Sequence, residues 1–109
     1  MRTPWNVIIT HAAIDDLKTF TKQDRGIIFE ALEKLAECHD PTRAFQVVEL
    51  RFSDPCAPWY RLRVVKGHLK ARVLFAVRRE RHAILVTAVL VRDGKTYDIG
   101  EARYTEAVR

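Results

Sequence analysis

The chain has 109 residues, of which 48% are hydrophobic, so it has enough apolar residues for one core and is not expected to be disordered. Its 19 Lys and Arg residues outnumber 14 Asp and Glu residues, which gives a formal net charge of +5. The longest strongly apolar run, Ala83–Val91, has nine residues and is too short to span a membrane. Two cysteines are too few for a disulfide scaffold, and the N-terminus lacks the pattern of a signal peptide. We therefore expect one cytoplasmic domain covering residues 1–109.

The first part of the chain predicts one strand followed by a helical hairpin. Residues Trp5–Thr10 are short, β-branched and aromatic, which is typical of a strand. Apolar residues then recur at helical spacing over His11–Phe20 and again over Arg25–Cys38, before Asp40-Pro41 ends the second helix. The candidate N-caps are Thr10 for the first helix and Thr21 or Asp24 for the second.

Beyond Pro41 the hydrophobic period changes from helical to strand-like. Strands are expected at Phe45–Phe52, Trp59–Val65, Lys70–Val77 and His82–Val91, with Gly67-His68 as a hairpin turn and a proline-containing loop over 53–58. The last strand is apolar on both faces, as an interior strand is. Residues 101–109 predict a short terminal helix. The expected fold class is α+β, with an N-terminal strand and helical hairpin packed on a small, mainly antiparallel twisted sheet.

The positive charge is concentrated in one segment. Residues Trp59–His82 contain eight Lys or Arg residues and one acid, Glu80, for a net charge of +7. The remaining 11 basic and 13 acidic residues net −2. A basic segment on a nearly neutral body indicates a polyanionic partner, with a solvated outer face as the alternative.

Strand alternation divides the side chains of the predicted hairpin between two faces. The apolar rows face the helices, so Arg61, Arg63, Lys70 and Arg72 point to the opposite face. A turn centred on Gly67-His68 places Arg63 directly opposite Arg72, where like charges repel. Bound phosphates would turn this repulsion into attraction, since arginine pairs with phosphate through charge-assisted hydrogen bonds. The alternative is neutralisation by acids from elsewhere, such as Glu49 or Glu101.

Other features of the sequence give weaker indications. Trp59 and Tyr60 stand beside Arg61, and aromatic residues next to arginines suit single-stranded nucleic acid. Cys38, His39, Cys56 and His68 lack the spacing of a metal site, so we expect no metal and no cofactor. The residues expected to contact RNA are Trp59, Lys70, Arg78, Arg79 and Arg81.

The order of these elements, with Tyr60-Arg61-Leu62-Arg63 on one strand and Ala71-Arg72-Val73-Leu74-Phe75 on the next, resembles the RelE/ParE superfamily of type II toxins. The similarity runs over nearly the whole chain. In the RelE branch, the resemblance implies metal-independent cleavage of mRNA in the ribosomal A site, giving a 2′,3′-cyclic phosphate, and silencing by a cognate antitoxin. The HigB-like branch is also ribosome-dependent, whereas the ParE branch inhibits DNA gyrase and is not a nuclease.

The resemblance also suggests which residues form the site. Arg61, Arg63, Arg72 and Arg92 match basic positions of the RelE pattern, and a C-terminal tyrosine, Tyr97 or Tyr104, would stack on a base or orient the attacking hydroxyl. Glu49 and His68 are the candidates for a general base. The leading hypothesis is a ribosome-dependent mRNA endoribonuclease with a cognate antitoxin, the ribosome and mRNA as partners. The alternatives are a gyrase inhibitor and an inactive module that binds RNA or the antitoxin.

Overall fold

A computed structural model describes residues 3–50 and 59–91 of the chain. Within these residues, five strands, two α-helices and two short 3-10 helices form an α+β fold, as the sequence predicts. In chain order the elements are β1 (Asn6–Ile9), α1 (His11–Leu17), α2 (Lys22–Ala36), η1 (Pro41–Arg43), β2 (Val47–Leu50), β3 (Trp59–Lys66), β4 (Leu69–Arg78), η2 (Arg79–Arg81) and β5 (Ala83–Val91). The predicted helix at 101–109 lies outside the described residues.

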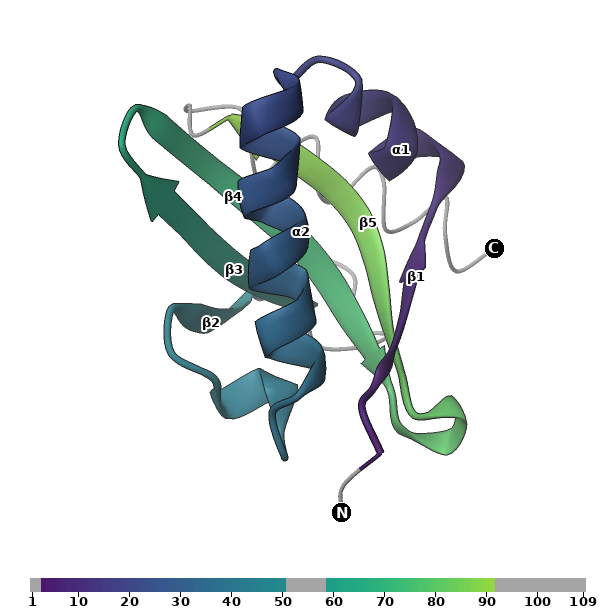
Figure 1. The fold of residues 1–109 in the computed structure, drawn as a ribbon. Coiled ribbons are helices and arrows are strands. Elements are labelled where there is room, and N and C mark those ends of the chain that lie inside the picture. Colours follow the sequence, from purple (N-terminus) through teal and green to yellow (C-terminus); the bar gives the residue numbers. More distant parts are fainter. Residues whose placement is uncertain (1–2, 51–58, 92–109) are drawn as a thin grey trace.

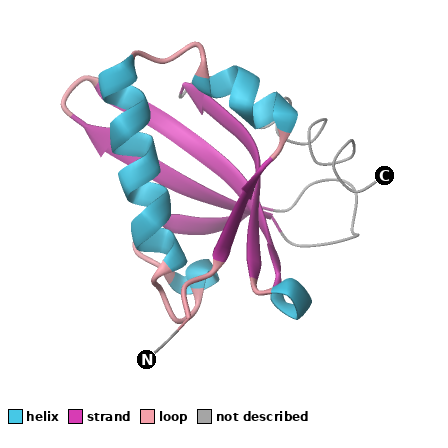
Figure 2. Cartoon of the chain, turned by 45° about the vertical axis from the view of Figure 1, so that its right-hand side comes forward, coloured by secondary structure: helices cyan, strands magenta, loops and turns pink. Residues whose placement is uncertain are grey.

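The strands form one sheet in the order β1-β5-β4-β3-β2. Strand β1 pairs with β5 in parallel, and all other neighbouring strands in this order are antiparallel. Both helices lie on the same side of the sheet, with α2 running across it and α1 beside β5 (Figures 1 and 2). The sheet therefore has one face turned toward α2, called here the helix face, and an opposite face.

The hydrophobic core lies between α2 and the helix face. Ile28 and Leu32 of α2 pack with Val73, Phe75 and Val86 of the sheet, and none of the five is more than 2% exposed. The opposite face also contains buried side chains, including Leu74, Ala83 and Ala88. Strand β5 is therefore buried on both faces, as its uninterrupted apolar sequence predicts.

Both helices begin at threonine caps. The Thr10 hydroxyl accepts a hydrogen bond from the Ala13 backbone N–H at 3.2 Å, and the Thr21 hydroxyl accepts one from Asp24 at 3.1 Å. Because Thr21 is the cap, α2 begins at Lys22, three residues before the predicted start at Arg25. The choice between Thr21 and Asp24 is thereby settled by geometry.

Strand β2 is shorter than predicted. It begins at Val47 because Gln46 adopts a left-handed backbone conformation with φ of +69°, which interrupts the extended chain. Phe45, predicted as its first residue, lies outside the strand and is 87% exposed. No helix in the described part of the chain is both long and apolar enough to cross a membrane.

One side chain of α1 completes the hydrogen bonding of β5. Strand β1 ends at Ile9, opposite Val86, so among the described strands none lies beside this edge of β5 beyond that point. There the Asp16 carboxylate accepts a hydrogen bond from the Val89 backbone N–H at 3.0 Å. The Asp16 carboxylate is therefore directed against the sheet, although its neighbour Asp15 is exposed.

Replacement of Asp16 by alanine is expected to destabilise the protein by about 1–3 kcal/mol, because the Val89 N–H loses its partner in a part-buried position. Chemical denaturation of the wild type, Asp16→Ala and a control variant measures the change in the free energy of unfolding. Asp15→Ala is the matched control, since Asp15 is exposed and, within the described part of the chain, pairs with exposed Lys18 at the end of α1; it should change stability by less than about 0.5 kcal/mol. Equal effects of the two substitutions would contradict the assignment of Asp16 to β5.

Candidate nucleic-acid interface

The β3–β4 hairpin has the predicted register. Gly67 and His68 form its turn, and Gly67 adopts φ of +60°, which a glycine takes at little cost in a two-residue hairpin turn. Val65 pairs with Lys70, and Arg63 pairs with Arg72. The pairing of Arg63 with Arg72 that the sequence predicts is therefore confirmed.

Backbone hydrogen bonding brings the two arginines close together. The Arg63 backbone N–H donates to the Gln46 carbonyl at 3.0 Å, so it points toward β2 and away from β4. Arg63 and Arg72 therefore form a non-hydrogen-bonded antiparallel pair, in which Cα atoms lie about 4.5 Å apart and side chains approach most closely. The side chains of Arg63 and Arg72 therefore leave the sheet from neighbouring positions on the same face.

Two further basic residues share the face opposite the helices. Arg61 is next but one to Arg63 on β3, and Lys70 is next but one to Arg72 on β4, so alternation directs all four to the same side. Arg63 and Lys70 are exposed, whereas Arg61 and Arg72 are half-buried and engaged in further contacts. We call these four residues, Arg61, Arg63, Lys70 and Arg72, the basic face.

Neither residue considered as a general base in the sequence lies on the basic face. Glu49 pairs with Tyr60, and Tyr60 belongs to the helix-facing row, so Glu49 points to the helix face. It can neither neutralise the arginine pair nor remove a proton there. His68 is exposed on the hairpin turn, beyond the end of both strands.

The structure divides the remaining predicted site residues into three groups. The Trp59 side chain is only 1% exposed, so its ring is not available to stack on a base, and its assignment as an RNA contact is corrected on that ground. Arg78 lies at the far end of β4, while Arg79 and Arg81 lie in η2, all distant in register from the basic face. Arg92, Tyr97, Tyr104 and Glu101 lie outside the described residues.

A second charged cluster, which the sequence did not predict, lies at the end of the sheet. The Asp40 carboxylate accepts hydrogen bonds from the Thr42 hydroxyl at 2.7 Å and from the Thr42 backbone at 3.0 Å, and contacts the Arg79 guanidinium at 3.4 Å. The Thr42 hydroxyl bond, with the Arg79 charge, lowers the pKa of Asp40 below its ordinary value of 3.8. The one local signal was the sequence Asp40-Pro41-Thr42, which is typical of an aspartate that caps a turn. The partner, Arg79, is 39 residues away in sequence.

Tyr60 lies on the helix face, opposite Glu49 on β2 and within electrostatic reach of Asp40 and Arg79. Its ring stacks on Phe75 at a centroid distance of 5.7 Å. Burial raises the pKa of the Tyr60 phenol above its ordinary value of 10.0, and the Glu49 carboxylate raises it further, while Arg79 acts in the opposite direction. Within the described residues, no group of three His, Cys, Asp or Glu side chains is arranged to hold a metal ion.

Comparison with solved structures identifies the fold as that of RelE toxins. A double arginine-to-alanine mutant of the E. coli toxin RelE in the free state matches with a TM-score of 0.70 at 10% identity, over 98% of this chain and all of that one. A chain of the archaeal RelE–RelB complex from Pyrococcus horikoshii matches with a TM-score of 0.65 at 20% identity, over 84% of this chain and 99% of that one.

A chain of the toxin–antitoxin complex RelBE2 from Mycobacterium tuberculosis matches with a TM-score of 0.62 at 20% identity, over 83% of this chain and all of that one. No protein-family model matches the sequence, and no curated protein matches it significantly. The similarity to these proteins is therefore a similarity of fold at low sequence identity.

Substitution of Arg63 by glutamine is expected to leave the stability of the free protein unchanged or to raise it by up to about 1 kcal/mol, because it removes the repulsion with Arg72. Thermal melts at low and high salt measure the effect, and the gain should shrink as salt screens the charges. Arg63→Lys, which keeps the charge, is the control. A clear loss of stability in Arg63→Gln alone would show that the pair is neutralised in the free protein.

Substitution of Glu49 by glutamine is expected to lower the pKa of Tyr60, because the carboxylate that disfavours the phenolate is removed. The tyrosine pKa can be followed by NMR or by absorbance during alkaline titration. Since folding raises the pKa of Tyr60, its contribution to stability is complete below pH 10 and is lost as the pH rises through the folded-state value. Glu30→Gln on α2 is the control, and an unchanged Tyr60 pKa in Glu49→Gln would contradict the placement of Glu49 on the helix face.

Proposed function

We propose that the protein is the toxin of a type II toxin–antitoxin system and acts as a ribosome-dependent, metal-independent mRNA endoribonuclease. The observation that carries the proposal is the basic face on a RelE fold. Arg63 stands directly opposite Arg72, which brings two like charges together on one face of the sheet. A phosphate bound there would be attracted by both guanidinium groups, so this pairing supports phosphate binding.

The basic face fits the electrostatic part of RNA cleavage. Attack of a ribose 2′-OH on the adjacent phosphorus concentrates negative charge on the phosphate oxygens in the transition state. Guanidinium groups fixed on two neighbouring strands, Arg63 on β3 and Arg72 on β4, can donate to these oxygens from both sides. Half-buried Arg61 extends this donor set along β3.

The basic face does not itself supply proton transfer. Arginine is too basic to exchange protons readily near neutral pH, and Glu49 faces the other side of the sheet. In this proposal Arg92 adds a further positive charge, and Tyr97 or Tyr104 stacks on a base or orients the 2′-OH. The remaining proton-transfer groups then come from the ribosome or the RNA.

The proposed partners are a cognate antitoxin, the ribosome and mRNA. Two of the matched structures are complexes named as RelE with RelB and as a toxin–antitoxin complex, which supports an antitoxin partner for this chain. A strongly basic surface is also complementary to ribosomal RNA and to an acidic protein segment. We place the activity in the cytoplasm, where translating ribosomes are found.

A gyrase inhibitor is the second candidate, and one observation favours it. Among the described strand residues, the face opposite the helices carries no carboxylate and no imidazole. Inhibition of gyrase by binding requires no general base, whereas RNA cleavage needs proton-transfer groups that the basic face does not supply. The two candidates therefore differ in a measurable activity and share the fold.

The deciding experiment is an mRNA cleavage assay on translating ribosomes. The wild type is expected to cleave mRNA at A-site codons, and Arg72→Ala is expected to lower the cleavage rate by about 100-fold or more through loss of a transition-state donor. Lys22→Gln, which removes one exposed positive charge on α2, is the charge-matched control and should cleave at the wild-type rate. No A-site cleavage by the wild type, together with inhibition of gyrase supercoiling, would establish the second candidate in place of the first.

A further inference from the structure

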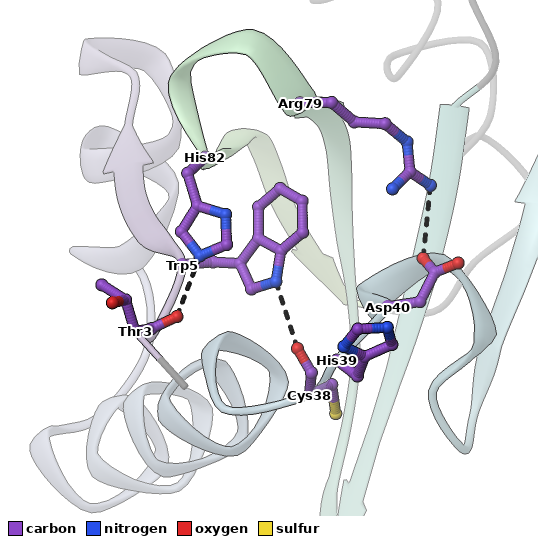
Figure 3. A pocket seen from close by; sticks show the side chains of 7 residues that line it. All are labelled: Thr3, Trp5, Cys38, His39, Asp40, Arg79 and His82. Carbon is purple, nitrogen blue, oxygen red and sulfur yellow. Dashed lines mark hydrogen bonds and ion pairs between the residues drawn. The ribbon is translucent and has the colours of Figure 1, made fainter. Parts of the chain in front are cut away.

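A cavity of about 780 Å³ opens at the end of the sheet remote from the hairpin turn. It lies where the chain enters β1, where α2 ends and where β4 connects to β5 (Figure 3). Arg79 follows Arg72 by seven positions, which is about 23 Å of extended chain. The cavity is therefore separate from the basic face. Its lining residues are Thr3, Trp5, Cys38, His39, Asp40, Arg79 and His82.

One wall of the cavity is a fixed aromatic stack. The Trp5 and His82 rings stack at a centroid distance of 4.1 Å with 19° between their planes. The Trp5 indole N–H donates to the Cys38 carbonyl at 3.1 Å, and His82 Nε2 lies 2.9 Å from the Thr3 carbonyl oxygen. His82 takes a left-handed backbone conformation with φ of +49°, which is uncommon for a residue with a side chain. These hydrogen bonds hold both rings in place. Binding of a planar ligand therefore costs little side-chain entropy at this wall.

The facing wall carries a guanidinium group. Arg79 extends across the cavity opposite Trp5, with His39 and Asp40 beside it (Figure 3). One terminal nitrogen of Arg79 contacts Asp40 at 3.4 Å, and Arg43 contacts the same carboxylate at 3.9 Å. Two guanidinium groups around one carboxylate leave a net positive charge. Arginine has five N–H donors, so the single contact with Asp40 leaves Arg79 donors for an anion.

We propose that this cavity binds a single nucleotide, with its base against the part-exposed His82 ring, which stacks on the mostly buried Trp5 ring, and its phosphate at Arg79. The volume lies within the range of small-molecule sites, about 300–1,000 Å³. A flat heterocycle suits the aromatic wall, and a phosphate suits a guanidinium group with free donors. The nucleotide is either free in solution or the end of a single RNA strand. The site does not depend on the proposed cleavage activity.

Titration of the full chain with the four ribonucleoside monophosphates tests the proposal. The expected result is saturable binding that shifts the indole N–H resonance of Trp5 and leaves that of Trp59 in place, because only Trp5 lines the cavity. Inorganic phosphate and the free nucleosides, used as probes of each half of the ligand, are expected to bind at least tenfold more weakly. Nucleotide shifts confined to the amides of Arg63 and Arg72, or no saturable shift at Trp5, would overturn the proposal.

Substitutions of charged residues test whether Arg79 binds the nucleotide. Arg79→Gln is expected to weaken nucleotide binding at least tenfold, and Lys22→Gln, a loss of one charge on the far end of α2, is expected to leave it unchanged. Melting temperatures of both variants establish that they are folded. Unchanged binding in folded Arg79→Gln would also overturn the proposal.

A 5′-phosphorylated trinucleotide of RNA distinguishes the two sources of the ligand. If it binds more tightly than the monophosphate and loses this affinity in Arg79→Gln, the cavity holds the end of an RNA strand. Equal or weaker binding of the trinucleotide assigns the site to a free nucleotide. Both measurements use the isolated protein, so they are independent of the outcome on translating ribosomes.

Discussion

The two-residue turn at Gly67 and His68 fixes the register on which both faces of the sheet depend. Side chains alternate along a strand, so a slip of one residue in the β3–β4 pairing would exchange the two faces of one strand relative to the other. The present register puts Leu62 and Val73 into the core while it sets Arg63 against Arg72. Core packing and charge repulsion are thus imposed by the same pairing. The apolar burial on the helix face offsets the smaller electrostatic cost on the other.

The local elements of this fold could be predicted from the sequence because their signals are local. Threonine caps lie beside the helices they begin, and the hairpin follows from two alternating rows around one glycine. The contact of Asp16 with Val89 could not be predicted, because it depends on β1 ending before β5 does. The same reasoning applies to Glu49, whose face is set by the pairing of β2 with β3.

The functional residues also differ in how far the sequence predicts them. The arginine pair lies within one hairpin, so its position followed from turn and alternation. The cavity at the other end of the sheet collects residues from the entry to β1, the end of α2 and the β4–β5 connection, and no spacing in the sequence brings these together. Trp59 illustrates a further limit, because an aromatic ring beside arginines has the same sequence pattern whether it is exposed or, as here, 1% exposed.

The parallel pairing of β1 with β5 has a consequence for the synthesis of the protein. Asn6 pairs with Ala83, so an early segment of the chain finds its place in the sheet only after about 77 further residues exist. The β3–β4 hairpin, by contrast, needs only its own residues and forms from local contacts. On the ribosome, the basic hairpin can therefore form while the chain is still unfinished, but the closed sheet and the cavity beside β1 must wait until β5 has emerged. Strand β1, the first to be synthesised, can therefore join the sheet only after β5, the last of the described strands.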